Sequence, residues 1–305
     1  MCWTVFSGFY IPTEQPNIEQ PQKKEFIKWI DFNPTSEVIK KTISLVNHNL
    51  KKESEFAFPD FFEILAFVAL KNSNKFNNST DSKLIDKLKK SLDNLENPID
   101  KFKGNKYFKY YDESFRAILS GIVGFKGEEK KEFAIIGHHP IARGYWYGDS
   151  DDFGNSRSFG FKRKHLGHDM FGNIGTPIMA MEGGTITELG WNRYGGWRIG
   201  ITSLDTKRYY YYAHLRNKIP YPPEFKIGDK VESGQLIGYL GNTGYGKKGS
   251  VLKNTSPHLH LGLQIIFDPC QIKGPKEIWV DIYQIVRLLC GKRVQYVKPK
   301  PNATE

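Results

Sequence analysis

The sequence predicts an α+β chain in which an N-terminal helical bundle is followed by a β-rich domain built on an antiparallel sheet. Two features of the 305-residue chain support this prediction. Apolar residues recur at helical spacing between residues 24 and 124, which is typical of amphipathic helices. After Gly124 the chain breaks into short β-rich runs separated by glycines, which is typical of strands and turns.

Helices in the first half are expected where apolar periodicity follows a capping residue. One follows the cap candidate Ser36, a second follows cap candidates at 80–82, and a third is expected over 112–122. The periodic positions of the first two are Val38, Ile39, Thr42, Leu45 and Val46, then Leu84, Ile85, Leu88, Leu92 and Leu95. The apolar run 61–70 is about half as long as the roughly 20 residues that span a bilayer, so it predicts a core helix and no transmembrane segment.

Strands are expected in the second half at 185–189, 198–202, 209–213 and 259–266, and a final helix at about 279–289. The loose C-terminal tail is expected from 298 onwards. The predicted organisation is an extended N-terminal segment (1–24), a helical accessory domain (25–125), the β-rich domain (126–270), a C-terminal helix packed on that domain (271–292) and a tail (293–305).

The formal net charge of +11 favours an anionic partner, which could be nucleic acid, an acidic membrane or anionic cell wall polymers. The lysines are scattered, and the chain has neither zinc-finger spacing nor an aromatic RNA-binding signature. Nucleic acid is therefore not expected as a partner. The three cysteines are an odd number without metal-ligand spacing, which argues against a disulfide framework.

No signal peptide is recognisable at the start of the sequence, because Cys2 follows Met1 without a charged region or an apolar region before it. Two interpretations remain open. The protein is cytoplasmic, or its export segment has been removed. Cys2 is correspondingly a lipid-attachment residue or an incidental cysteine.

The histidines are distributed unevenly: seven of the eight lie in the β-rich half. A lone histidine is more often structural than a ligand, so the spacing must support any claim of a site. His165 and Asp169 would share one face of a strand, and His258 and His260 would share one face of another. His168 would point to the opposite face.

Zinc binds four tetrahedral ligands, and a catalytic site keeps one position for water, so two histidines and one carboxylate suffice. Each of the two motifs alone is a weak signal. Together with a third candidate, His214, they predict a metal site in the β-rich half. The sequence has no HExxH helix, which argues against a thermolysin-like arrangement.

The order and spacing of six motifs between about 130 and 270 resemble the lysostaphin-type zinc metalloendopeptidases. These motifs are His165-Leu-Gly-His-Asp169, Gly175-Thr-Pro-Ile178 with Ala180, Tyr212-Ala-His214-Leu, Gly228-Asp-Lys-Val231 with Gly234-Gln, Gly241-Asn-Thr-Gly244 and Pro257-His-Leu-His260. The segment from Asp151 to Arg157 is similar to the stretch that leads into the domain in this family. The resemblance identifies 126–270 as a peptidase domain of this type.

The resemblance implies that His165, Asp169 and His260 bind Zn²⁺ and that His214 and His258 are catalytic. A zinc-activated water would attack a peptide carbonyl in bacterial peptidoglycan. His258 would accept the proton while His214 positions the water or stabilises the oxyanion, and the two roles could be exchanged.

The main departure from the family is a basic insertion at 245–256, which should border the cleft and could gate it, or could be a tolerated surface loop. His168 is interpreted as structural. Tyr209 and Tyr211 either line a substrate groove or pack in the core.

Two other readings are weaker. The segment 226–238 is similar in style to biotinyl and lipoyl carriers, but no lysine stands at the attachment turn. Glu63 alone does not make the carboxylate pair of a glycosidase and is interpreted as structural.

The sequence therefore predicts an active zinc metalloendopeptidase, a hydrolase of the stem peptide or cross-bridge of peptidoglycan, located in the cell wall or secreted. The alternative is a noncatalytic or latent relative that binds cell wall or activates a partner hydrolase. All five ligand and catalytic candidates are present, which favours activity. The sequence leaves the oligomeric state, the bond and the role of the helical part open.

Overall fold

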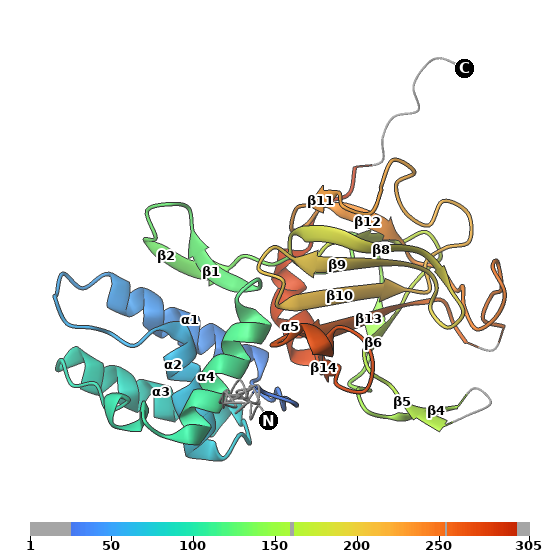
Figure 1. The fold of residues 1–305 in the computed structure, drawn as a ribbon. Helices are drawn as coiled ribbons and strands as arrows, with labels where there is room; N and C mark the ends of the chain where they lie inside the picture. The colour runs from blue at the N-terminus through green and yellow to red at the C-terminus, as the bar shows by residue number, and fades with distance from the viewer. Residues whose placement is uncertain (1–25, 159–161, 254, 298–305) are drawn as a thin grey trace, which may run out of the picture.

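The computed structural model describes residues 26–158, 162–253 and 255–297, which form a helical part beside a large β-sheet (Figure 1). The α+β architecture predicted from the sequence is confirmed. The expected extended segment 1–24 and the loose tail from 298 lie outside the described residues. Among the described residues, no helix is both long enough and apolar enough to cross a membrane.

Side-chain caps define the starts of the four N-terminal helices. Thr35, and not the predicted Ser36, caps the first helix, because its hydroxyl accepts the Val38 N–H while Ser36 already lies in the helix. Asp60 and Glu63 form a reciprocal capping box on the second helix, so Glu63 has a structural role. The helices are α1 (Ser36–Leu50), α2 (Phe61–Asn72), α3 (Asn78–Asp93) and α4 (Lys106–Leu119).

One of these helices agrees with the prediction and another begins earlier than predicted. The run at 61–70 is indeed a core helix, and its residues from Ile64 to Ala69 are nearly all fully buried. Helix α4 begins at Lys106, six residues before the predicted start at 112, because Asn105 caps it by accepting two backbone N–H groups. The helical part ends in a hairpin of β1 (Val123–Lys126) and β2 (Glu132–Ile135), which the sequence did not reveal.

The main sheet is antiparallel, with the strand order β11-β8-β9-β10-β13-β6-β3, and β14 also pairs with β13. Its strands are β3 (Gly148–Asp149), β6 (His168–Phe171), β8 (Gly184–Asn192), β9 (Gly196–Ser203), β10 (Arg208–Ala213), β11 (Lys230–Val231), β13 (His258–Ile265) and β14 (Ile278–Val280). Two small hairpin sheets accompany it: β4 (Ser156–Ser158) with β5 (Lys162–Lys164), and β7 (Pro177–Met179) with β12 (Leu236–Tyr239).

The C-terminal region corrects one expectation. The predicted helix from 279 is a strand at its start, because Ile278 and Val280 bury alternate side chains and β14 pairs with β13. Helix α5 (Tyr283–Leu288) begins only after Asp281, whose carboxylate accepts the Tyr283 N–H. It lies between the sheet and the helical part (Figure 1).

Alternation along β10 separates two pairs of tyrosines. Tyr210 and Tyr212 are completely buried in the core, whereas Tyr209 and Tyr211 lie on the opposite face and line a cavity of about 610 Å³ together with Trp279. Of the two alternatives left open for Tyr209 and Tyr211, the structure favours the lining of a cavity, because the even-numbered positions of β10 face the core.

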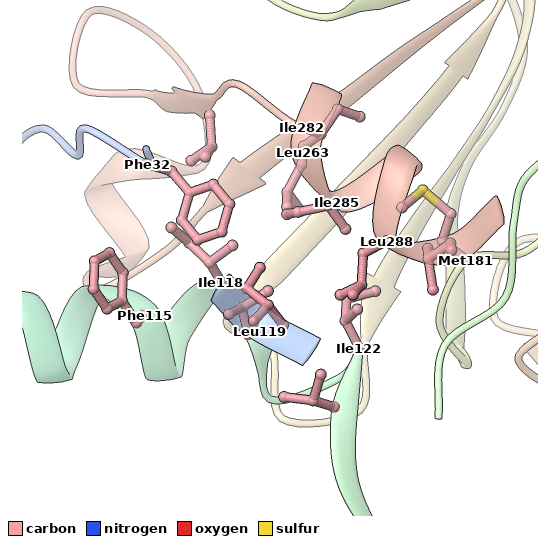
Figure 2. Packing of buried hydrophobic residues seen from close by; sticks show 14 of the residues in the cluster. Phe32, Phe115, Ile118, Leu119, Ile122, Met181, Leu263, Ile282, Ile285 and Leu288 are labelled. Atoms are coloured by element: carbon pink, nitrogen blue, oxygen red, sulfur yellow. The ribbon is translucent and has the colours of Figure 1, made fainter. Parts of the chain in front are cut away.

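One continuous apolar core joins the two parts of the molecule. Figure 2 shows side chains of α4 and the segment after it meeting side chains of α5 and β13. The labelled residues at this junction are Phe32, Phe115, Ile118, Leu119, Ile122, Met181, Leu263, Ile282, Ile285 and Leu288. The helical part thus covers apolar surface that the sheet and α5 would otherwise expose to water.

A buried ion pair lies at the same junction. Arg208 Nε is 2.7 Å from Glu182 Oε2, and the two side chains are only 3% and 11% exposed. Arg208 also donates to the carbonyl oxygen of Ala117 in α4, and Tyr210 donates its hydroxyl hydrogen to Glu182. These bonds tie the end of α4 to the central strands.

We expect Glu182→Gln to lower the free energy of unfolding by on the order of 3 kcal/mol, because the buried Arg208 guanidinium loses its main counter-charge. Urea unfolding at neutral pH measures this loss. The control is Asp205→Asn, since Asp205 also pairs with Arg208 at 2.9 Å but its side chain is 41% exposed. That change should cost less than about 1 kcal/mol. Equal losses for the two variants would contradict the assignment.

His139 is a second buried polar group, with no solvent exposure. Its Nδ1 accepts the Ile141 N–H at 3.0 Å, so this nitrogen is unprotonated. Burial, only partly offset by the nearby Ile141 carbonyl oxygen, lowers the pKa of His139 to about 4. The unfolded chain therefore binds a proton at a higher pH than the folded chain does, near the usual value of about 6.5.

Stability should consequently fall as the pH drops from about 6.5 to about 4, by up to about 3 kcal/mol from this group. His139→Asn keeps an acceptor for Ile141 and removes the titration. Unfolding measured across this range should give a shallower pH dependence for the variant than for the unmodified chain. Parallel curves would show that His139 does not cause the loss.

Candidate functional site

The pairing register of β13 brings two candidate ligands together. His260 of β13 lies directly opposite Asp169 of β6 on one side and opposite Ala213 of β10 on the other. The third candidate, His165, lies in the segment before β6 and not in the strand. The predicted alternation from His165 to Asp169 therefore does not apply, yet the short loop still turns the imidazole toward the same point.

The donor atoms of these three residues form a compact triangle. His165 Nε2 lies 3.0 Å from Asp169 Oδ1 and 2.9 Å from His260 Nδ1, and His260 Nδ1 lies 3.0 Å from Asp169 Oδ1. Ligands at about 2.0–2.1 Å from a tetrahedral zinc ion are separated by about 3.3 Å. The spacing and the two-nitrogen, one-oxygen donor set thus fit a zinc ion with small outward shifts.

The charges in this triangle suit a cation. Burial acts to raise the pKa of Asp169, but hydrogen bonds with His165 and His260 hold it well below its usual range. Burial acts to lower the pKa of His165, and the hydrogen bonds with Asp152 and Asp169 outweigh it and raise the pKa to about 9. A metal ion that binds Nε2 would replace the proton that His165 otherwise carries there.

Asp152 holds the His165 ring through Nδ1, the nitrogen that faces away from the triangle. Its carboxylate oxygen lies 3.1 Å from His165 Nδ1, which leaves Nε2 directed at the other two candidate ligands. Arg157 pairs with Asp152 and lies 3.5 Å from Asp169 Oδ2. The sequence identified Asp152 and Arg157 only as part of the approach to the domain, because no local pattern links a carboxylate to a histidine thirteen positions later.

His214 and His258 lie next to the triangle, and each is held in one tautomer by a backbone carbonyl. His214 Nδ1 is 2.7 Å from the Thr243 oxygen, and His258 Nδ1 is 2.8 Å from the Ser256 oxygen. A carbonyl only accepts, so Nδ1 carries the hydrogen and Nε2 of the neutral ring is a free acceptor. The two ring centroids are 4.8 Å apart.

His214 is buried and has a backbone φ of 59°, which a residue other than glycine adopts only when its surroundings impose it. Burial, together with the neighbouring His258 and His260, lowers its pKa to about 3, so the ring is neutral near pH 7. His258 Nε2 points into the site, 3.8 Å from Asp169 Oδ1. The structure thus brings all five predicted residues into one place.

These five residues line a cavity of about 500 Å³. The insertion predicted to border the cleft does so, because it contributes Tyr245, Val251, Leu252, Lys253 and Thr255 to the wall. On the other side of His260, the ring of Tyr211 lies 6.0 Å away and leads to the cavity that contains Trp279. A second cavity therefore lies beside the candidate site, on the same face of the sheet.

His168 faces away from the cavity, as the strand alternation predicts. Its Nε2 lies 3.0 Å from Asp149 Oδ2, and its ring contacts Tyr283 of α5. This position supports the structural interpretation of His168.

An antiparallel sheet that carries a His-Asp-His cluster beside two further histidines has the arrangement of a metal-dependent hydrolase. Residues 163–271 match the model of Peptidase family M23, and this part of the chain is a domain of that family. The resemblance to lysostaphin-type peptidases inferred from the sequence motifs is confirmed.

Several curated proteins are similar to this chain. An L-Ala–D-Glu endopeptidase of Bacillus subtilis is 39% identical over 187 residues, which cover 58% of this chain and 53% of that protein. Lysostaphin of Staphylococcus simulans is 42% identical over 97 residues, which cover 32% of this chain and 17% of lysostaphin. The chain thus spans about half of the Bacillus subtilis relative and a smaller share of lysostaphin.

Among solved structures, a Ruminococcus gnavus protein provisionally assigned as a glycyl-glycine endopeptidase lytM is similar, with a TM-score of 0.55 and 25% sequence identity. The alignment covers 86% of this chain and 94% of that chain. The structural similarity therefore extends well beyond the family domain and includes much of the helical part.

Gly167 leaves the space that the His260 ring needs. A Cβ at this position would lie 2.6 Å from His260 Cε1 and 2.9 Å from the Leu261 carbonyl oxygen. We expect Gly167→Ala to displace the ring and weaken zinc binding by about 10–100-fold, as loss of ligand support typically does. Competition with a chelating dye measures the affinity. Gly291→Ala is the control, since a Cβ there meets nothing within 4 Å. Unchanged affinity in Gly167→Ala would refute the packing argument.

Proposed function

We propose that this chain is a zinc metalloendopeptidase that hydrolyses a peptide bond in bacterial peptidoglycan. The observation that supports this most directly is that the three donor atoms and the free Nε2 atoms of His214 and His258 all face one cavity. Two relatives are named for the bond that they cleave: an L-Ala–D-Glu endopeptidase of Bacillus subtilis and a glycyl-glycine endopeptidase of Staphylococcus capitis.

His165, Asp169 and His260 would hold the zinc ion, which when bound lowers the pKa of water and polarises a carbonyl. His258 Nε2 would accept the proton of the attacking water, because its Nδ1 is already committed to Ser256. His214, whose Nδ1–H is bonded to the Thr243 carbonyl, would accept a hydrogen bond from the attacking water at Nε2 and so position it. Cleavage of the C–N bond passes the proton from His258 to the leaving amine.

We propose that the protein acts outside the cytoplasm, because peptidoglycan is there and the net charge of +11 favours anionic wall polymers. In this proposal 25–125 is an accessory domain for 126–270, and 271–292 closes the junction between them. The contribution of the accessory domain 25–125 would be structural, since its helix α4 and the C-terminal helix α5 share one core.

We expect about one zinc per purified chain and release of peptide fragments from purified peptidoglycan that a chelator stops and added zinc restores. His260→Ala should lose both zinc and activity, since it removes a ligand. His258→Ala should keep most of the zinc and lose activity by a factor of about 10² or more, since it removes the proton acceptor. Metal analysis and chromatography of the released fragments measure these outcomes.

His48→Ala is the matched control, because His48 lies on α1 far from the cavity in the sequence and pairs with the exposed Asp93. It should keep both zinc and activity. Equal zinc loss in His258→Ala and His260→Ala would overturn the division of roles. Zinc without release from several wall types would favour the alternative, a latent or wall-binding relative.

A further inference from the structure

Basic side chains dominate the walls of the cavity beside the candidate metal centre. Arg157, Arg163 and Lys253 line it, and Asp169 is the single acidic residue among the described residues that do so. Asp169 is committed to the metal in the proposed function, on which this inference rests. The free part of the cavity therefore carries positive charge.

Two of these cations come from one hairpin. Arg157 of β4 and Arg163 of β5 lie directly opposite each other in the register, so both side chains project from the same face. Like charges in this arrangement repel each other unless an anion lies between or beside them. Arg157 has such anions, because it pairs with Asp152 and approaches Asp169.

Arg163 differs from Arg157. No acidic group within the described part of the chain forms a salt bridge with it, and its buried Nε–H has no hydrogen-bond acceptor there. The guanidinium is nevertheless held in place, with Cζ 5.4 Å from the centroid of the Tyr245 ring. A positioned guanidinium that lines a cavity and has no acidic partner is suited to a carboxylate, which its terminal N–H groups can bind through two parallel hydrogen bonds.

Alternation along β5 places the Arg163 side chain at the cavity and the side chains of Lys162 and Lys164 on the opposite face. Arg163 is partly buried against the cavity, whereas Lys162 and Lys164 on either side are exposed. Lys253 of the insertion adds a second cation to the same cavity. The basic character of this wall is thus specific to the cavity face and is not a general property of the hairpin.

We propose that Arg163, assisted by Lys253, binds a carboxylate of the substrate next to the scissile bond, so that the site selects acidic peptides. An uncharged glycine bridge offers no partner for Arg163, whereas a D-glutamyl residue with a free carboxylate does. Arg163 is then a specificity-determining residue, and the metal ligands and histidines act on either substrate class.

Two synthetic peptides test the proposal. Both contain the Ala–D-Glu bond, one with a free carboxylate beside it and the other with a carboxamide at that position. The zinc-loaded full chain should cleave the carboxylate peptide with a kcat/KM about 10–100-fold higher, as expected for a charge-assisted pair. Arg163→Gln should remove this preference, mainly by raising KM for the carboxylate peptide, and should leave the zinc content and the carboxamide peptide almost unchanged.

Lys162→Gln is the matched control, because it removes the same charge from the adjacent, exposed position of β5. It should keep the preference for the carboxylate. Equal cleavage of the two peptides, or the same loss in Lys162→Gln and Arg163→Gln, overturns the proposal. Release of fragments from peptidoglycan without cleavage of either peptide also overturns it while leaving the peptidase activity standing. No cleavage of any wall substrate overturns the proposed function itself.

Discussion

The register of β13 against its two neighbours is the constraint on which the site depends. On one face this strand buries Leu259 and Leu261 in the core, and on the other it presents His260 to Asp169. A shift by one residue would move the leucines to the cleft and the histidine into the core. The apolar face therefore fixes the position of His260, and no separate interaction has to select it.

Two residues of the candidate site are positioned by loops and not by strands. His165 and His214 lie outside the strands, and backbone contacts place them: His165 bonds through its own N–H and carbonyl to 154–155, and His214 donates its N–H to Gly195. The carbonyls of Thr243 and Ser256 then fix the imidazole tautomers. The strands thus fix the positions of Asp169, His258 and His260, and the loop carbonyls orient the imidazole rings of His214 and His258.

The sequence predicted well those features that a local pattern determines. Alternation identified β8, β9, β10 and β13, helical periodicity identified α1 and α3, and the motif spacing identified five residues that the structure brings together. The chemical roles of these five residues stay a prediction. Errors arose where distant contacts decide the outcome.

One wrong prediction and two features that the sequence left undetermined show the cause. Ile278–Val280 is a strand because β13 offers a free edge, which no helical or strand propensity reveals. The support of His165 by Asp152 depends on a loop closing in space. The face of Tyr209 and Tyr211 depends on which parity the core selects, and a run of four tyrosines carries no such signal.

The shared core between α4, α5 and β13 bears on how this chain can be divided. In many two-domain proteins the domains are joined only by a flexible linker, and cleavage of the linker separates two folded domains. Here a cut before residue 126 would leave Ile282, Ile285 and Leu288 facing water and Arg208 without the Ala117 carbonyl. The stretch defined by the peptidase motifs is therefore smaller than the unit that buries this core. A fragment cut to that stretch would expose an apolar surface and would tend to aggregate.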